Sequence, residues 1–473
     1  MSLIRSPITG DAIREVADVT PAGLDDAFDA ARAAAPVWRA VPPTERGRLL
    51  VEVGRRMRAR IDEVAELETL NTGKLVADTR REAERAAGCF EYYGGYADKV
   101  VGSVIPVPGP FHTYTLREPY GVVAGIIPWN VPYFFAAKKI APALAFGNVS
   151  LLKPAQETPL TALLLGEIVA EVLAGAGLPG GIVQVLAGGG ELGRALVSDP
   201  RTDMVVFTGS ARTGAAVGSA AAAHFAPAAL ELGGKSPQLV FADADLDAAV
   251  AGVVEGIVGS CGQMCIAGSR LYVQAAVYPQ FLDRLADRVR GLRVGDPRMA
   301  GTQVGPQVTQ AQADKTGEYI ARGQADGGRL IAQAELPTAP ELAGGYWVPP
   351  TVLADVDPKS PLLQEEVFGP VLAVDRFTDE VDAVELAHRT RFGLAAGVWT
   401  GDPGRAHRMA AALRVGTVWV NTYRILSDLV PFGGVGHSGY GREGGADAVG
   451  LYTWTKSVWL ATDPGVPSTY GKG

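Results

Sequence analysis

Three residues in the chain have side chains that could together carry out nucleophilic chemistry on a carbonyl group. Cys265 ends a Gly-Gln-Met-Cys segment, and a cysteine thiolate is a strong nucleophile and a good leaving group from a thioester. Glu231 stands between two leucines, where partial loss of water would raise its pKa and make it a general base near neutral pH. Asn130 follows a Pro-Trp pair, and an amide fixed in a turn can donate to an oxyanion.

Each of these residues also has an ordinary structural explanation. A free cysteine is most often a small, buried core residue. A glutamate that precedes two glycines can be a solvated strand end, and an asparagine two residues before Pro132 is a common turn former. Taken one at a time, the residue types leave both explanations open.

Two glycine-rich segments could bind phosphate groups. The first, residues 188–193, matches the pattern GxGxxG after a short apolar run, but its crossover is short and no acidic residue follows at the expected distance. In the second, residues 207–214, a strand runs directly into a helix that begins with small and hydroxyl residues. Because the free N–H groups of a helix N-terminus attract anions, we favour the second segment for a pyrophosphate.

Short apolar runs alternate with helical patterns through the middle of the chain. Strands that alternate with helices indicate βαβ units and a parallel sheet. Asn130 and both glycine-rich segments follow strands of this series. We expect strands at residues 122–127, 149–152, 182–186, 204–208 and 238–241, and helices at residues 136–146, 160–173 and 246–258.

The first hundred residues have apolar spacing near 3.6, which predicts helices at residues 24–35, 44–68 and 78–96. Two strand-like pieces, residues 100–115 and 453–460, lie outside the main series and suggest a separate small sheet. Unpaired strand edges often pair with another subunit. Pairing within one chain is an equal alternative on the pattern alone.

Composition excludes several classes of protein. A net charge of −8 argues against nucleic-acid or anionic-membrane partners. Three cysteines in 473 residues are too few for a disulfide scaffold, which favours a reducing cytoplasm. The five histidines show no metal-ligand spacing, so we expect no metal. We see no secretory signal, and proline and asparagine interrupt the most apolar stretch, residues 121–137, so we expect no membrane span.

Seven motifs, taken in order along nearly the whole chain, resemble those of the aldehyde dehydrogenase superfamily. The 34 residues between Glu231 and Cys265 also fit that family's spacing. The motifs occupy residues 128–130, 152–155, 207–210, 230–237, 262–265, 365–370 and 431–434.

The resemblance implies an α/β fold with three parts. A Rossmann-like NAD(P)-binding domain would comprise residues 1–100 and 120–233, and a second αβα catalytic domain residues 234–436. Residues 101–119 and 437–473 would form an oligomerisation arm and C-terminal tail in a homodimer or homotetramer.

The resemblance also implies a mechanism. Cys265 would attack an aldehyde, and the side chain of Asn130 with the backbone N–H of Cys265 would hold the oxyanion. Hydride would then pass to the nicotinamide and leave a thioester. Glu231 would activate the water that hydrolyses the thioester to a carboxylic acid, with Lys139 as a proton relay. Because a coenzyme A-acylating enzyme would not need this base, Glu231 favours hydrolysis.

For the cofactor, the family places Lys153 and Gln156 at the adenosine ribose, Ser210 at the pyrophosphate and Glu366 at the nicotinamide ribose. Many NAD-specific members carry a glutamate where this chain has Gln156, and a neutral amide lacks the repulsion toward a 2′-phosphate. We therefore expect NAD, with NADP accepted. The full set of expected cofactor-binding residues is Ile126, Ile127, Trp129, Lys153, Gln156, Gly189, Gly209, Ser210, Leu232, Gly233, Glu366 and Phe368.

The family's substrate tunnel varies between members, and most matching residues here are apolar, which favours an aliphatic or aromatic aldehyde. Either Lys138 or Arg424 could instead pair with the carboxylate of a semialdehyde; the alternative is a solvated lysine and an arginine in a structural salt bridge. Cys261, four residues before the nucleophile, is a regulatory thiol or a buried spectator. The expected lining residues are Val131, Phe135, Lys138, Met264, Ile266, Arg424 and Phe432.

Overall fold

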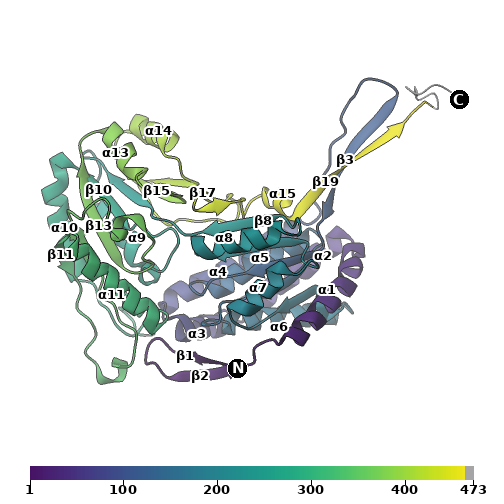
Figure 1. Ribbon diagram of the computed structural model, residues 1–473, viewed down its shortest axis with the longest axis horizontal. Helices are drawn as coiled ribbons and strands as arrows, with labels where there is room; N and C mark the ends of the chain where they lie inside the picture. The colour runs from purple at the N-terminus through teal and green to yellow at the C-terminus, as the bar shows by residue number, and fades with distance from the viewer. Residues whose placement is uncertain (464–473) are drawn as a thin grey trace.

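The alternating strands and helices expected after residue 121 form a parallel sheet in the computed structural model, which describes residues 1–463 (Figure 1). The strands and helices predicted between residues 122 and 258 are confirmed to within a few residues. The elements of this first sheet region are β4 (Val122–Ile126), α5 (Pro132–Ala145), β5 (Val149–Lys153), α6 (Leu160–Gly175), β6 (Val183–Val185), α7 (Gly190–Ser198), β7 (Met204–Gly209), α8 (Ala211–Ala222) and β8 (Ala228–Leu232).

The first sheet has a reversal of strand order at its centre. Its five parallel strands lie in the order β8-β7-β4-β5-β6. The chain therefore adds strands outward from β4 in one direction, and α7 then returns it to β7 on the other side of β4. Ligands of doubly wound sheets bind outside the carboxyl ends of the strands at such a switch point. The switch point here lies between Ile126 at the end of β4 and Gly209 at the end of β7.

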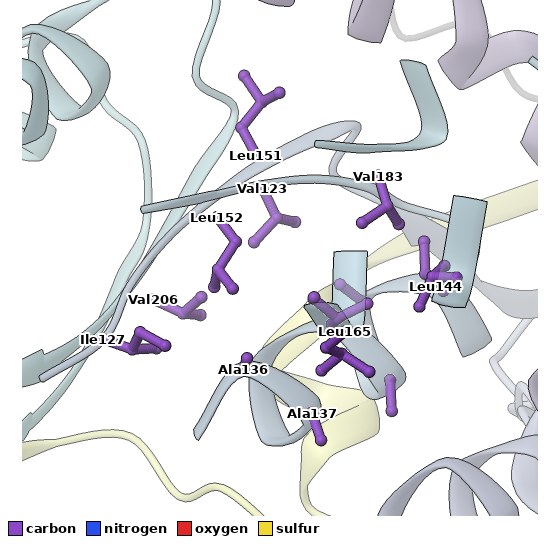
Figure 2. Packing of buried hydrophobic residues seen from close by; sticks show 14 of the residues in the cluster. Val123, Ile127, Ala136, Ala137, Leu144, Leu151, Leu152, Leu165, Val183 and Val206 are labelled. Carbon is purple, nitrogen blue, oxygen red and sulfur yellow. The ribbon is translucent and has the colours of Figure 1, made fainter. Parts of the chain in front are cut away.

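Apolar side chains from four strands, β4 to β7, and two helices, α5 and α6, form the core beneath this switch point. Figure 2 shows Val123 and Leu152 of neighbouring strands close to Ala136 of α5 and Leu165 of α6. All four are buried. Because each fully buried valine or leucine contributes roughly 1.5–3 kcal/mol, this layer fixes the strand ends in place.

A second sheet, of seven strands, is formed by strands between residues 237 and 420. Its order is β11-β12-β13-β10-β9-β15-β16, parallel except at the edge strand β11. The elements are β9 (Pro237–Val240), α9 (Leu246–Val258), β10 (Arg270–Gln274), α10 (Tyr278–Arg290), α11 (Gln310–Ala325), β11 (Arg329–Gln333), β12 (Thr351–Ala354), α12 (Pro361–Gln364), β13 (Val371–Phe377), α13 (Glu380–Ala387), β15 (Ala395–Trp399), α14 (Pro403–Ala412) and β16 (Thr417–Val420).

The N-terminal part is helical after a short hairpin, and one predicted helix is two. The helix expected at residues 44–68 breaks at Arg60, whose φ of −118° is not helical. Asp62 and Glu63 then stand in the first turn of the next helix, where carboxylates stabilise a new N-terminus. The elements are β1 (Ser2–Arg5), β2 (Ala12–Val16), α1 (Pro21–Ala40), α2 (Pro43–Ala59), α3 (Ile61–Thr72) and α4 (Val76–Tyr96).

The two stray strand-like pieces pair with each other in one chain, although the strand of the first piece begins at Phe111 rather than at residue 100. β3 (Phe111–Pro119) and β19 (Thr453–Ala461) are antiparallel over their whole length and extend together from the body (Figure 1). The arm still exposes large apolar side chains, among them Val104 and Trp459. Residues 464–473 of the expected tail lie outside the described residues.

The segment just before β19 returns to the first sheet. β18 (Gly439–Tyr440) pairs antiparallel with β8, and α15 (Ala448–Tyr452) contacts α5. A short pair, β14 (Phe392–Gly393) with β17 (Val435–Gly436), precedes this return. Residues 437–452, assigned by sequence to the arm and tail, therefore pack with the first sheet. No helix within residues 1–463 is long and apolar enough to cross a membrane.

Candidate active site

Cys265 lies where two cavities meet. The larger cavity, about 630 Å³, opens at the carboxyl ends of β4 and β7. The smaller cavity, about 400 Å³, lies between α5 and residues 417–432. Cys265 and Phe135 line both cavities. Because Cys265 is free and only half-buried, its thiol can meet one molecule from each side.

The backbone before Cys265 has an uncommon conformation. Ser260, Cys261 and Gly262 have φ values of 51°, 59° and 72°. This left-handed region costs about 1–3 kcal/mol at each non-glycine residue and occurs often at functional sites. At Gly262 a Cβ atom would lie 2.2 Å from the carbonyl carbon of Gly369. The turn that presents Cys265 therefore requires glycine at this position.

Loss of hydration raises the pKa of both cysteines in this segment, Cys261 and Cys265. Desolvation, followed by the carboxyl groups of Glu366 and Glu231, raises the pKa of Cys265 to about 12. At neutral pH Cys265 is therefore a thiol in the absence of bound ligands, and its proton must be accepted when it attacks. Burial also raises the pKa of Cys261 to about 12. A buried, neutral thiol is a poor redox sensor, which favours the spectator interpretation of Cys261.

Asn130 follows β4 and lines the larger cavity with Cys265. Its Nδ2 donates to the carbonyl of Gln263 at 2.8 Å, and its second proton has only the sulfur of Met264 at 3.7 Å. Rotating the amide would place Oδ1 against the Gln263 carbonyl, so the hydrogen bond fixes its orientation. A substrate oxyanion would be a far better acceptor than the Met264 thioether.

Glu231 lies at the end of β8 and lines the larger cavity. Neither of its carboxyl oxygens has a hydrogen-bond partner within residues 1–463. Desolvation by burial, together with the negative charge of Glu443, raises the pKa of Glu231 to about 8. Gly433 passes so close that a Cβ atom there would lie 2.6 Å from Glu231 Oε1. Glu231 is thus poised as a general base near neutral pH.

A buried ionic cluster lies next to Glu231. Lys139 makes a hydrogen bond to Glu443, and Lys138 Nζ lies 3.2 Å from Glu443 Oε2. Burial lowers the pKa of Lys139, partly offset by Glu443. Lys139 therefore bonds to Glu443 rather than to Glu231. No sequence motif singled out Glu443; the only signal was a carboxylate inside a glycine-rich segment.

All twelve residues expected to bind the cofactor line the larger cavity. Both glycine-rich segments, residues 188–193 as well as residues 207–214, reach this cavity because α7 and α8 both begin there. Ser210 is the N-cap of α8 and accepts from the N–H of Thr213 at 3.3 Å. The other free N–H groups of that first turn can bind an anion.

Glu366 also lines the larger cavity. Its Oε1 accepts from the N–H of Gly234 at 3.1 Å, and burial raises the pKa of Glu366 to about 7. A Cβ atom at Gly233 would lie 2.1 Å from Glu366 Oε2. Gln312 and Lys315, which the sequence did not reveal, also line the cavity and donate to backbone carbonyls of this loop.

The Gln156 side chain contacts the N-terminal hairpin. Gln156 Nε2 donates to Ser2 Oγ at 2.8 Å, and Ser2 donates in turn to Asp18 at 2.6 Å. Lys153 Nζ donates to the carbonyl of Pro154 at 2.8 Å, and burial lowers the pKa of Lys153. The hairpin thus helps to position one end of the larger cavity.

The smaller cavity contains six of the seven expected substrate residues. Arg424 does not line it: its Nη1 donates to Glu255 at 3.0 Å, which is the structural salt bridge considered as the alternative. Arg85 of α4 lines the cavity instead and pairs with Asp428 at 3.1 Å. The six residues that line it are Val131, Phe135, Lys138, Met264, Ile266 and Phe432.

Comparison with known proteins agrees with this geometry. The family model "Aldehyde dehydrogenase family" matches residues 3–458. A betaine aldehyde dehydrogenase of Cereibacter sphaeroides is 45% identical over 460 residues, which cover 97% of this chain and 93% of the relative. The chain therefore belongs to the aldehyde dehydrogenase family, an oxidoreductase class.

Solved structures are similar over nearly the whole chain. A putative aldehyde dehydrogenase from Burkholderia cenocepacia is 41% identical with a TM-score of 0.96 and covers 99% of this chain and 96% of its own. A betaine aldehyde dehydrogenase from Staphylococcus aureus in complex with NAD+ is 34% identical with a TM-score of 0.96, covering 99% and 93%. The fold of this chain is thus the aldehyde dehydrogenase fold.

Proposed function

We propose that this chain oxidises an aldehyde to a carboxylic acid by the hydrolytic route, with NAD as the oxidant. One observation carries the proposal: Cys265 lies at the junction of the two cavities, with Glu231 on the wall of the larger one. The overall reaction converts an aldehyde, NAD+ and water into a carboxylate, NADH and two protons. The substrate would occupy the smaller cavity and the cofactor the larger.

The larger cavity fits a dinucleotide. The first turn of α8 at Ser210 would receive the pyrophosphate, and the buried carboxyl of Glu366 would accept from ribose hydroxyls. Thr208 Oγ1 is buried without a hydrogen-bond partner in the described chain, a further polar atom free for the ligand. When bound, the nicotinamide supplies a hydride acceptor beside Cys265.

In the first half-reaction, the Cys265 thiol would release its proton, one of the two that the overall reaction sets free, as its sulfur bonds to the aldehyde carbon. The carbonyl oxygen becomes an oxyanion, which the Asn130 amide and the backbone N–H of Cys265 would stabilise. When the oxyanion re-forms a carbonyl, hydride leaves the carbon and a thioester remains on Cys265. Phe135, which lines both cavities, would help to exclude bulk water from this step.

In the second half-reaction, Glu231 would take a proton from water as the water attacks the thioester. The C–S bond then breaks, the carboxylic acid leaves and Cys265 regains a proton. Glu231 could pass its proton toward the Lys139–Glu443 pair, whose charges lie close enough to shift its pKa. A water-activating base of this kind supports acid as the product rather than acyl-coenzyme A.

The cofactor end of the site supports NAD with NADP accepted. Gln156 is neutral, but Glu157 beside it lines the same cavity and would disfavour a 2′-phosphate. Lys153 and Arg194, also on that wall, would attract the phosphate. The ratio of kcat/KM for the two cofactors tests this, and complete rejection of NADP would contradict it.

The smaller cavity suits an uncharged aliphatic or aromatic aldehyde. Its wall is mainly apolar, and each cation that lines it already faces a carboxylate: Lys138 with Glu443, and Arg85 with Asp428. An uncharged substrate would leave both pairs intact. A charged substrate would have to compete with a partner already in place.

A semialdehyde is the second candidate, and one observation favours it. Arg85 Nε is buried without a hydrogen-bond partner within residues 1–463, so a substrate carboxylate that reached it would satisfy this donor. Replacing Arg85 by methionine should then reduce kcat/KM for succinic semialdehyde but not for butanal. An equal effect on both aldehydes would remove this candidate.

The arm and the free thiols support two further proposals. Exposed Trp459 and Leu460 on the outer part of β19 would be covered in a homodimer or homotetramer. Cys89, Cys261 and Cys265 are all free, which supports a reducing, cytoplasmic location.

The decisive experiment is a panel of aldehydes with NAD, followed by NADH absorbance and by chromatography of the product. We expect the free acid to form without coenzyme A, and Cys265→Ser to abolish it. Acyl-coenzyme A formation, with no acid in its absence, would overturn the hydrolytic route.

A further inference from the structure

We propose that Lys138 excludes aldehydes that carry a cationic group next to the carbonyl carbon. This would separate the chain from the betaine aldehyde dehydrogenases to which it is similar. The inference rests on the proposed aldehyde oxidation at Cys265 and defines its substrate class.

Lys138 is placed where a substrate must pass. It lies on α5, is only 7% exposed, and lines the smaller cavity together with Cys265. Its Nζ lies 3.2 Å from Glu443 Oε2 and 4.8 Å from the centre of the Phe432 ring. The ammonium group therefore covers an aromatic face of the cavity wall.

Quaternary ammonium ligands are bound through such aromatic faces. In this cavity the face of Phe432 already receives the Lys138 cation. A trimethylammonium group could not take the same place without displacing a buried cation from both its carboxylate and its ring.

The charges near the reacting carbon favour the same conclusion. Glu443 alone balances two cations, Lys138 and Lys139. Glu231 is mostly uncharged at pH 7, because burial raises its pKa to about 8. Arg442 adds another positive charge that acts on Glu231. On the Lys138 side of the nucleophile, three cations, Lys138, Lys139 and Arg442, therefore outnumber the Glu443 carboxylate.

Two other carboxylates line the smaller cavity but are already paired. Asp428 lies 3.1 Å from Arg85, and Glu82 bonds to the buried Lys74. Neither is a free anion that could attract a cationic substrate. In betaine aldehyde the nitrogen is only two bonds from the carbonyl carbon, so its charge cannot stay at the cavity entrance while Cys265 bonds to that carbon.

The test compares betaine aldehyde with 3,3-dimethylbutanal, which has the same shape with carbon in place of the charged nitrogen. We expect the unmodified enzyme to prefer the neutral aldehyde in kcat/KM by about 100-fold, the size for like charges roughly 5 Å apart at an effective dielectric constant of about 20. Lys138→Met should reduce that preference at least about tenfold. Lys99→Met, which removes an exposed surface lysine, should leave it unchanged.

The extent to which betaine aldehyde is hydrated in solution does not depend on the enzyme variant. The measured quantity is therefore the change, between variants, in the kcat/KM preference for the neutral aldehyde. An unchanged preference in Lys138→Met, or equal use of both aldehydes by the unmodified enzyme, would overturn the inference. If the unmodified enzyme oxidised no aldehyde at all, the proposed function itself would fail.

A second measurement does not depend on the variant folding. Choline and 3,3-dimethylbutan-1-ol are the corresponding charged and neutral alcohols, and each can be tested as an inhibitor of 3,3-dimethylbutanal oxidation. We expect the neutral alcohol to inhibit at concentrations at least about tenfold lower. Equal or stronger inhibition by choline would overturn the role of Lys138.

Discussion

The rate of thioester hydrolysis should depend on pH near neutrality, because the pKa of Glu231 is raised. Burial raises the pKa of this carboxyl to about 8, with a further contribution from Glu443. A general base works only when deprotonated, so hydrolysis should weaken as pH falls below 8. With this pKa about 10% of Glu231 is ionised at pH 7 and about 1% at pH 6, so the rate of hydrolysis should fall roughly tenfold between them.

Replacing Glu231 by glutamine removes the base and keeps the size of the side chain. General-base catalysis typically contributes about 10²–10⁴-fold, so the steady-state rate should fall by that factor. The first half-reaction does not need the base in this role, so one equivalent of NADH per active site should still form rapidly. Glu68→Gln changes a buried carboxyl that lines neither cavity, and it controls for a general loss of packing.

Rapid-mixing measurements of NADH absorbance between pH 6 and 10 separate the two steps. The initial burst reports the chemistry of Cys265, and the subsequent linear phase reports hydrolysis. Glu443→Gln should move the inflection of the linear phase to lower pH, because it removes a negative charge and leaves Lys138 and Lys139 unbalanced. An undiminished linear phase in Glu231→Gln, with its pH dependence intact, would refute the assignment of Glu231.

Three further outcomes are expected. Gly433→Ala should slow hydrolysis at least about tenfold, because the added methyl group would push against Glu231. Gly450→Ala, whose methyl group would meet open space, should have no such effect. The linear phase of NADH formation measures the rate of hydrolysis in both variants. Cys265 in the cofactor-free enzyme should react slowly with iodoacetamide at pH 7 and faster as pH rises, because its pKa is about 12. Mass spectrometry of the labelled peptide measures the rate of this reaction. A rate independent of pH would contradict the raised pKa. Trp459→Asp should reduce the molar mass measured by light scattering, whereas an unchanged mass would show that the arm does not hold subunits together.

Most of the first sheet could be predicted from the sequence, because buried parallel strands leave continuous apolar runs between helical patterns. The twelve residues expected to bind the cofactor follow instead from the resemblance to the aldehyde dehydrogenase family, and all of them line the larger cavity. β18 could not be predicted, because a two-residue strand such as Gly439–Tyr440 has no periodicity. Its pairing with β8 depends on contacts made only in the folded chain.

The charged residues that line the smaller cavity could not all be predicted from the sequence. Arg424 and Arg85 are equally plausible as residue types, but only Arg85 reaches the cavity. Arg424 has a positive φ of 63°, and its guanidinium contacts Glu255 instead. Which arginine faces the substrate depends on how α4 packs against residues 425–430, which no local pattern encodes.

The glycine-rich stretch of residues 433–441 approaches Glu231, the proposed base, at two of its glycines. Gly433 leaves room for the Glu231 carboxyl, and Gly439 pairs with the Glu231 backbone at a point where a Cβ atom would lie 1.9 Å from the carbonyl oxygen of Leu230. Just after this stretch, the Glu443 carboxylate accepts a hydrogen bond from Lys139 and holds it near Glu231. One short segment thus fixes the position, the solvent exclusion and the pKa of the base, so changes along it should alter thioester hydrolysis before they alter attack by Cys265.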